Sequence, residues 1–206
     1  MPLLLSRNSE NQQVYMWEFS EGLEGFRAEL GNSVVDKMLA EIKLEKRAIE
    51  KLGQLTLLKI AGLDKYELYQ DKHRKPHLKD GPGISFSHTK NRVMLLVSEG
   101  SCGVDLEIEN PKIQVIAKKF MSEKELERYP NENERFWIWS IKEAVFKFFG
   151  YHVDFRGDMF VSDLSPEENK AFVSYSGLHG KGIFELELLT FEEYKAALTK
   201  HYEKSI

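Results

Sequence analysis

Two acidic residues alternate with apolar ones in the segment 103–107, which reads Gly-Val-Asp-Leu-Glu. In an extended strand, side chains two positions apart point to the same face, so Asp105 and Glu107 would lie side by side. Two carboxylates at this spacing repel each other unless a cation lies between them, and a hard divalent ion with oxygen ligands commonly takes that place. The segment therefore indicates either a metal site or a solvent-facing acidic strand edge.

A second group lies on the segment 139–147, where an aromatic residue, an acid and a base recur at intervals of four. Trp139, Glu143 and Lys147 would share one face of a helix, opposite its apolar face. The acid and the base could instead form an exposed i,i+4 ion pair, which contributes roughly a few tenths of a kcal/mol. Neighbouring aromatic residues favour a well-packed environment: Phe136, Trp137 and Phe146.

A third group combines a basic residue before proline, Lys75, with the sequence Ser-His-Thr at 87–89. Neighbours on a strand point to opposite faces, so Ser87 and His88 are poorly placed to act as a nucleophile and its base. We interpret Ser87, His88 and Thr89 as donors to phosphate or ribose oxygens. A purely structural role for His88 is the alternative.

Three helical segments are expected to position these groups. Apolar residues recur at helix-like spacing over 34–63, 113–129 and 134–149, and the first of these could be one helix or two. Gly150 is placed to end the last helix, because glycine readily adopts the left-handed conformation found after helix C-termini.

Strand-like runs, separated by turn residues, fill much of the remaining chain: 84–87, 92–98, 102–108, 159–164, 171–176 and 182–189. The first three are close enough in sequence to predict an antiparallel meander. Strands and helices occur in the order β, α, β, β and then α, β, β, which predicts an α+β protein with two halves, residues 1–101 and 102–206.

Composition narrows the class of protein. The net charge is −4, from 29 Lys and Arg against 33 Asp and Glu, which gives no overall electrostatic case for nucleic-acid binding. The opening Met-Pro-Leu-Leu-Leu-Ser lacks a basic region before its short apolar run, so we expect a first strand and no signal peptide or membrane span. A single cysteine, Cys102, favours a reducing compartment, so a cytoplasmic location is expected.

Five segments, taken in order, resemble the motif series of the 4′-phosphopantetheinyl transferases, with the Sfp-type subgroup (holo-acyl-carrier-protein synthases) as the closest match: Lys75-Pro76, Ser87-His88-Thr89, 103–107, 120–125 and 139–147. The resemblance covers roughly residues 44 to 150, and Gly-Val-Asp-x-Glu followed by Trp-x-x-Lys-Glu-Ala-x-x-Lys is specific as a pair. Residues 191–204 have helix-like spacing in isolation, but 194–199 resembles the family's closing strand, and we favour the strand.

The resemblance implies a monomer of two pseudo-symmetric α+β halves with the active site between them. It assigns Asp105, Glu107 and Glu143 as Mg²⁺ ligands, and Mn²⁺ would suit the same oxygen ligands. It assigns the contacts to coenzyme A, the co-substrate, as follows: Lys142 and Lys147 near the pyrophosphate, Lys75, Ser87 and His88 near the nucleotide, and Arg47 at the 3′-phosphate. Leu55 and Arg74 depart from the family pattern at positions on the adenine side.

The reaction implied is transfer of phosphopantetheine from coenzyme A to a serine of an apo acyl or peptidyl carrier protein. Glu143 is the candidate base for the serine, and Lys147 would offset charge on the leaving phosphate. Lys118 and Lys119, or another basic cluster, could form a docking surface for an acidic carrier protein. Two alternatives are a non-catalytic homologue that only binds carrier proteins and a Mg²⁺-dependent nucleotide phosphohydrolase. The sequence leaves open whether the carrier serves fatty-acid, polyketide or nonribosomal-peptide synthesis.

Overall fold

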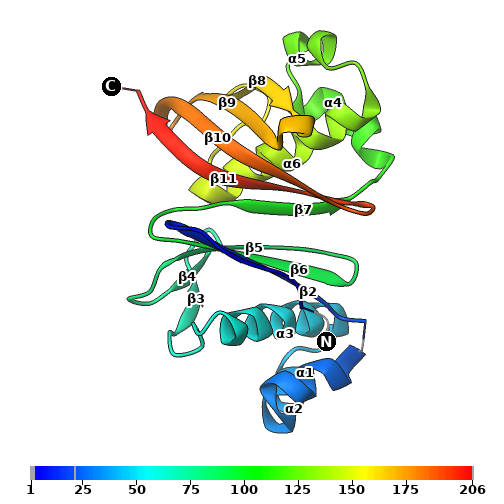
Figure 1. Cartoon of the computed structure of the whole chain (residues 1–206), viewed down its shortest axis with the longest axis vertical. Coiled ribbons are helices and arrows are strands. Elements are labelled where there is room, and N and C mark those ends of the chain that lie inside the picture. The colour runs from blue at the N-terminus through cyan, green and yellow to red at the C-terminus, as the bar shows by residue number, and fades with distance from the viewer. Residues whose placement is uncertain (1–2, 21, 206) are drawn as a thin grey trace. The chain divides into compact units, whose positions relative to one another are not determined.

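The computed structural model describes residues 3–20 and 22–205, which contain both helices and several sheets (Figure 1). This mixture confirms the predicted α+β class. The chain forms two compact units: Met1–Asp71 with Pro76–Gly100, and Lys72–Lys75 with Ser101–Ile206. None of the helices in the described part of the chain combines the length and apolar character needed to cross a membrane.

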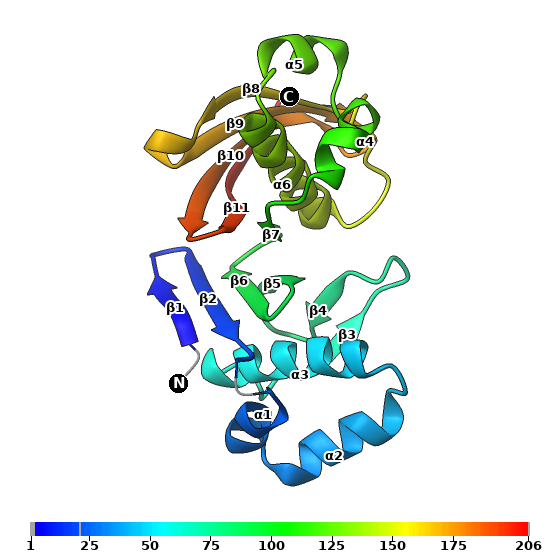
Figure 2. The ribbon, with the colours of Figure 1, turned by 90° about the vertical axis from the view of Figure 1, so that its right-hand side faces the viewer.

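The first unit contains a four-stranded antiparallel sheet in the order β1-β2-β6-β5. Its strands are β1 (Leu3–Asn8), β2 (Gln12–Glu18), β5 (Gly83–Thr89) and β6 (Arg92–Ser98). Helix α3 (Glu45–Ile60) packs on β2 and β6, and α1 (Gly22–Leu30) and α2 (Asn32–Glu41) pack on α3 (Figure 2). A short hairpin joins β3 (Leu68–Gln70) to β4 (Pro76–Leu78). The helical pattern over 34–63 thus corresponds to two helices, α2 and α3.

The second unit contains a five-stranded antiparallel sheet in the order β7-β11-β10-β9-β8. Its strands are β7 (Val104–Ile108), β8 (Met159–Ser165), β9 (Lys170–Gly177), β10 (Gly180–Phe191) and β11 (Tyr194–Lys204). Three helices follow β7: α4 (Lys112–Phe120), α5 (Glu123–Arg128) and α6 (Glu132–Phe149), and a 3₁₀ turn, Pro166–Glu168, follows β8. Helix α6 lies against β7 and β11 and contributes much of the unit's hydrophobic core.

Three local features differ from or refine the expectations. The predicted meander is wrong in its third strand, because β5 pairs with β6 whereas β7 pairs with β11 in the other unit. The segment 194–204 is a strand, as the resemblance implied. The predicted helix at 113–129 breaks at Met121, since Ser122 caps a new helix by accepting from the backbone N–H of Glu125.

Helix α6 ends where the sequence predicted. Gly150 adopts the left-handed conformation with φ of 88°, and its N–H donates to Phe146 O. At the other end, the Glu134 carboxylate accepts from the backbone N–H of Asn131 at 3.1 Å, which satisfies one of the donors that precede a helix. Both ends of the helix that carries the second group are therefore fixed by local interactions.

Cys102 lies just before β7 and is 1% exposed. Burial raises the pKa of its thiol to about 12, although Lys75 opposes the shift. Because the thiolate is the reactive form, native protein at pH 8 should resist iodoacetamide. One label per chain should appear in urea, as measured by intact mass. Rapid labelling of the native protein would contradict the buried position.

Candidate active site

Strand β7 begins at a point of close approach to α6. A Cβ atom on Gly103 would lie 1.9 Å from Ala144 O and 2.7 Å from Phe148 N, so only glycine fits here. The N–H of Gly103 donates to Thr199 Oγ1 at 2.9 Å, and the N–H of Thr199 donates to Gly103 O at 3.0 Å. These contacts hold the residues that follow Gly103 directly against α6.

Asp105 and Glu107 both face α6, as the strand period predicted. Asp105 is 3% exposed; its Oδ2 accepts from Ser140 Oγ at 3.0 Å and its Oδ1 accepts from Lys147 Nζ at 2.8 Å. Glu107 accepts a hydrogen bond from the side chain of Trp139. A solvent-facing acidic edge is therefore excluded for Asp105.

Glu143 completes what we call the acid cluster: Asp105, Glu107 and Glu143. Burial, together with the charges of Asp105 and Glu107, raises the pKa of Glu143 to about 7 against the opposing effect of Lys147. Burial and Asp105 likewise raise the pKa of Glu107 to about 7, although its bond from Trp139 and the charge of Lys147 lower it. Lys147 opposes both shifts, and because the two pKa values stay raised, it compensates the negative charge of the acid cluster only partly.

The acid cluster offers only oxygen donors, the ligand type that Mg²⁺ and Mn²⁺ prefer. Within 3–20 and 22–205, no three Asp, Glu, His or Cys side chains form a ready-made metal site. Lys147 and Ser140 each contact one oxygen of Asp105. A carboxylate has about four lone-pair positions, so Asp105 can keep these contacts and still bind a cation. The donor chemistry and the uncompensated charge both fit a divalent ion.

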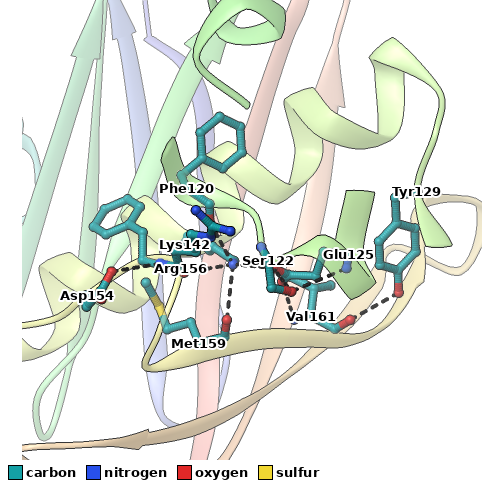
Figure 3. Close-up of polar contacts among 10 residues, drawn as sticks. Phe120, Ser122, Glu125, Tyr129, Lys142, Asp154, Arg156, Met159 and Val161 are labelled. Atoms are coloured by element: carbon teal, nitrogen blue, oxygen red, sulfur yellow. Dashed lines mark hydrogen bonds and ion pairs between the residues drawn. The ribbon is translucent and has the colours of Figure 1, made fainter. Parts of the chain in front are cut away.

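Lys142 does not lie where the resemblance placed it. Its side chain is fully buried, 0% exposed, and lies among the polar groups shown in Figure 3. Its ammonium group donates to Glu125 Oε2 at 2.8 Å and to three backbone carbonyls: Phe120, Phe155 and Met159. Lys142 therefore has no exposed atom with which to contact the pyrophosphate of coenzyme A, and the prediction of a cofactor contact is corrected to a structural role.

Glu125, the partner of Lys142, is also 0% exposed and fully hydrogen-bonded. Its Oε1 accepts from the N–H of Val161 at 2.9 Å, and its Oε2 accepts from the N–H of Ser122 at 2.8 Å (Figure 3). Burial lowers the pKa of Lys142, and Glu125 opposes that shift. The pair links α5, α6 and β8 through bonds that leave neither charge unpaired.

Two of the predicted cofactor contacts lie near the surface of the first unit. Arg47 is exposed in the first turn of α3, and His88 is 43% exposed at the end of β5. His88 Nε2 lies 2.9 Å from Glu50 Oε1, one helical turn beyond Arg47. Ser87 is buried, at 4% exposed. Within this unit, the contact between His88 and Glu50 thus brings the end of β5 close to the first turns of α3, where Arg47 lies.

Lys75 belongs to the short segment Lys72–Lys75, which groups with the second unit. Its ammonium group donates to Phe148 O near the C-terminus of α6, and its side chain packs beside Gly150. A cation at this end of a helix is favourable because the last carbonyls are unpaired and carry partial negative charge. Lys75 therefore stabilises α6 in addition to its predicted role at the nucleotide.

The sequence patterns did not predict two residues that hold the acid cluster in place, Ser140 and Thr199. Ser140 lies three residues before Glu143 and seven before Lys147, a helical spacing that places it on the same face. That spacing alone could have identified it. Thr199 could not be found this way, because it reaches Gly103 only through the pairing of β7 with β11.

A comparison with models of known protein families finds a match that includes the acid cluster. Residues 101–199 match the family model ACPS, the 4′-phosphopantetheinyl transferase superfamily. No curated protein sequence matches the chain. The matched residues include β7, all of α6 and the three members of the acid cluster. The segment that holds the candidate active site is thus similar to the 4′-phosphopantetheinyl transferase superfamily, which supports a transferase of the phosphopantetheinyl kind.

Proposed function

We propose that the chain transfers 4′-phosphopantetheine from coenzyme A to a serine of an apo acyl or peptidyl carrier protein, as Sfp-type enzymes do. The acid cluster carries the proposal: three partly compensated carboxylates beside Lys147, inside the segment that matches the superfamily. In the reaction, the serine oxygen bonds to the phosphorus that bears pantetheine. The pyrophosphate P–O bond breaks, and 3′,5′-adenosine bisphosphate leaves.

Asp105, Glu107 and Glu143 would hold the Mg²⁺ ion, and Mn²⁺ would suit the same donors. A bound divalent ion supplies charge that offsets the negative charge of the pyrophosphate. Ser140 and Trp139 orient the carboxylates by donating to Asp105 and Glu107. Lys147, which is 26% exposed, can extend its ammonium group toward the leaving phosphate.

A serine hydroxyl must lose its proton to become an effective nucleophile. Glu143 is the proposed acceptor, because it is the carboxylate of the acid cluster that lies on α6, one helical turn from Lys147. Arg47, Lys75 and His88 would contact phosphates of coenzyme A, and Ser87 would donate to the nucleotide. Lys142 is not among these residues, since it is buried elsewhere.

Two other activities remain to be separated from transfer by experiment: carrier-protein binding without turnover, and hydrolysis of a nucleotide pyrophosphate. The protein is incubated with coenzyme A and Mg²⁺, with and without an apo carrier protein, and the nucleotide products are separated by chromatography. Transfer predicts 3′,5′-adenosine bisphosphate only when the carrier protein is present. Release without a carrier would indicate hydrolysis, and no release in either sample would indicate a binding homologue.

The exposed face of α4 is the proposed docking surface for an acidic carrier protein. Val115 is 84% exposed, and Lys118 and Lys119 lie three and four residues further along the same face. Charge reversal, Lys118→Glu with Lys119→Glu, should raise the KM for the carrier protein about tenfold or more and leave the KM for coenzyme A unchanged. Steady-state kinetics with each substrate varied in turn measures both values, and an equal rise in both would contradict this surface.

A further inference from the structure

The first unit contains a cavity of about 450 Å³ that is separate from every residue assigned above to the proposed reaction. Helices α1, α2 and α3 and the segment 64–68 line it, and most of the lining is apolar, including Leu30, Val34, Met38, Leu55, Leu58 and Tyr66. Cavities of this size with apolar walls and few polar groups are typical of small-molecule sites.

Lys51 is the group that gives this cavity a chemical preference. It lies on α3 one turn before Leu55, is half-buried, and lines the cavity. Burial alone lowers the pKa of its ammonium group. Over residues 3–20 and 22–205, no carboxylate forms an ion pair with it and no acceptor receives its hydrogen bond. A desolvated cation without a partner is unfavourable, and a bound anion would relieve that cost.

The other charged residues of the lining are less suited than Lys51 to bind an anion. Lys59 is already occupied, because its Nζ donates to Glu29 O at the end of α1. Asp64 is exposed, so water screens its negative charge. Among the described residues, the lining holds two cations and one acid, and Lys51 is the cation that is both desolvated and unpaired.

The geometry points to a binding site for a fatty acid, with its hydrocarbon chain against the leucine, valine and methionine walls and its carboxylate on Lys51. An unbranched apolar chain suits a cavity formed by aliphatic side chains, since burial of methylene groups supplies most of the affinity. The single unpaired cation suits a single negative charge. This inference is independent of the proposed transfer reaction, because it uses none of the acid cluster.

Calorimetric titration of the full chain with sodium dodecanoate, below its micelle concentration, tests the inference. We expect saturable binding of one molecule per chain, and about tenfold weaker binding after Lys51→Met, which keeps the length of the side chain but removes its charge. Lys46→Met is the matched control, because Lys46 is 81% exposed on the same helix and does not line the cavity. It should bind as the wild type does. Val34→Trp should obstruct the cavity and weaken binding, because Val34 lines the cavity and is 40% exposed at its rim.

Dodecyltrimethylammonium, which has the same chain length and the opposite charge, gives a test on the wild type that needs no variant. The inference predicts no saturable binding of this cation. Equal binding of the two amphiphiles, no saturable binding of dodecanoate, or a loss smaller than about threefold in folded Lys51→Met would each overturn it. Thermal melting shows whether each variant is folded.

Discussion

Replacing Asp105 with asparagine is expected to lower kcat for carrier-protein modification by about 10²- to 10³-fold. Asp105 touches both the lysine and the serine that organise the acid cluster, at 2.8 and 3.0 Å. Asparagine keeps the size of the side chain, and its amide oxygen can still accept from Lys147 while its amide nitrogen donates to Ser140 Oγ. It removes the negative charge that a divalent ion requires. Steady-state kinetics with saturating coenzyme A and carrier protein measures the loss.

Two further variants serve as comparisons for the loss of kcat in Asp105→Asn. Ser140→Ala removes only a bond that orients Asp105, so we expect a smaller loss of about 10- to 100-fold. Glu109→Gln changes an acid just beyond β7 that is 67% exposed and pairs with Lys195, so its activity should equal that of the wild type. Equal losses for Asp105→Asn and Glu109→Gln would mean that general charge, and not the acid cluster, governs turnover.

Asp105→Asn should lose activity without losing stability. In metal-free buffer with EDTA, the pKa of Glu107 and of Glu143 is about 7 in the folded chain, above the usual value of 4.5, partly because of Asp105. A raised folded-state pKa means that these carboxylates destabilise the fold as pH rises through 7. The melting temperature of Asp105→Asn relative to the wild type should therefore increase between pH 5 and pH 8. A variant melting much lower than the wild type at pH 8 would show that Asp105 is mainly structural.

Lys142→Met is expected to lower the free energy of unfolding by about 3–5 kcal/mol, because it leaves the buried carboxylate of Glu125 without its counter-charge. Glu125→Leu should cost a similar amount by isolating the ammonium group. The double variant should be more stable than the sum of the two losses predicts, since both charges are then absent. Urea unfolding followed by tryptophan fluorescence measures all three.

The ion pair between Lys170 and Glu185 provides the control for this cycle. Its atoms lie 3.3 Å apart, and both side chains are 40% exposed. Lys170→Met should therefore change the free energy of unfolding by only about 0–1 kcal/mol. If Lys142→Met were equally mild, the buried network around Glu125 would not stabilise the unit, and a contact between Lys142 and the cofactor would again be open.

Local sequence patterns predicted the acid cluster because each part of it follows a short period. Asp105 and Glu107 follow the two-residue period of a strand, and Glu143 and Lys147 follow the four-residue spacing of a helix. Gly150 likewise ends α6 as predicted. The positions of these side chains therefore follow from local geometry.

Features set by long-range pairing were not predictable in this way. Strand β7 follows β5 and β6 closely in sequence yet pairs with β11, about ninety residues later, so the meander was wrong. The segment Gln12–Glu18 was missed as a strand because four successive residues, 14–17, are buried and no alternation appears. Lys142 looked accessible because its partners, Glu125 and three carbonyls, reach it only after α5, α6 and β8 have packed.

The mass of an apo carrier protein tests the central claim most directly. The carrier is incubated with coenzyme A, Mg²⁺ and either the wild-type chain or Asp105→Asn, and its intact mass is measured over time. The acid cluster as a phosphopantetheinyl transferase site predicts a gain of one phosphopantetheine arm per carrier with the wild type and a much slower gain with Asp105→Asn. An unchanged carrier mass with the folded wild-type protein, or equal rates for the two proteins, would contradict it.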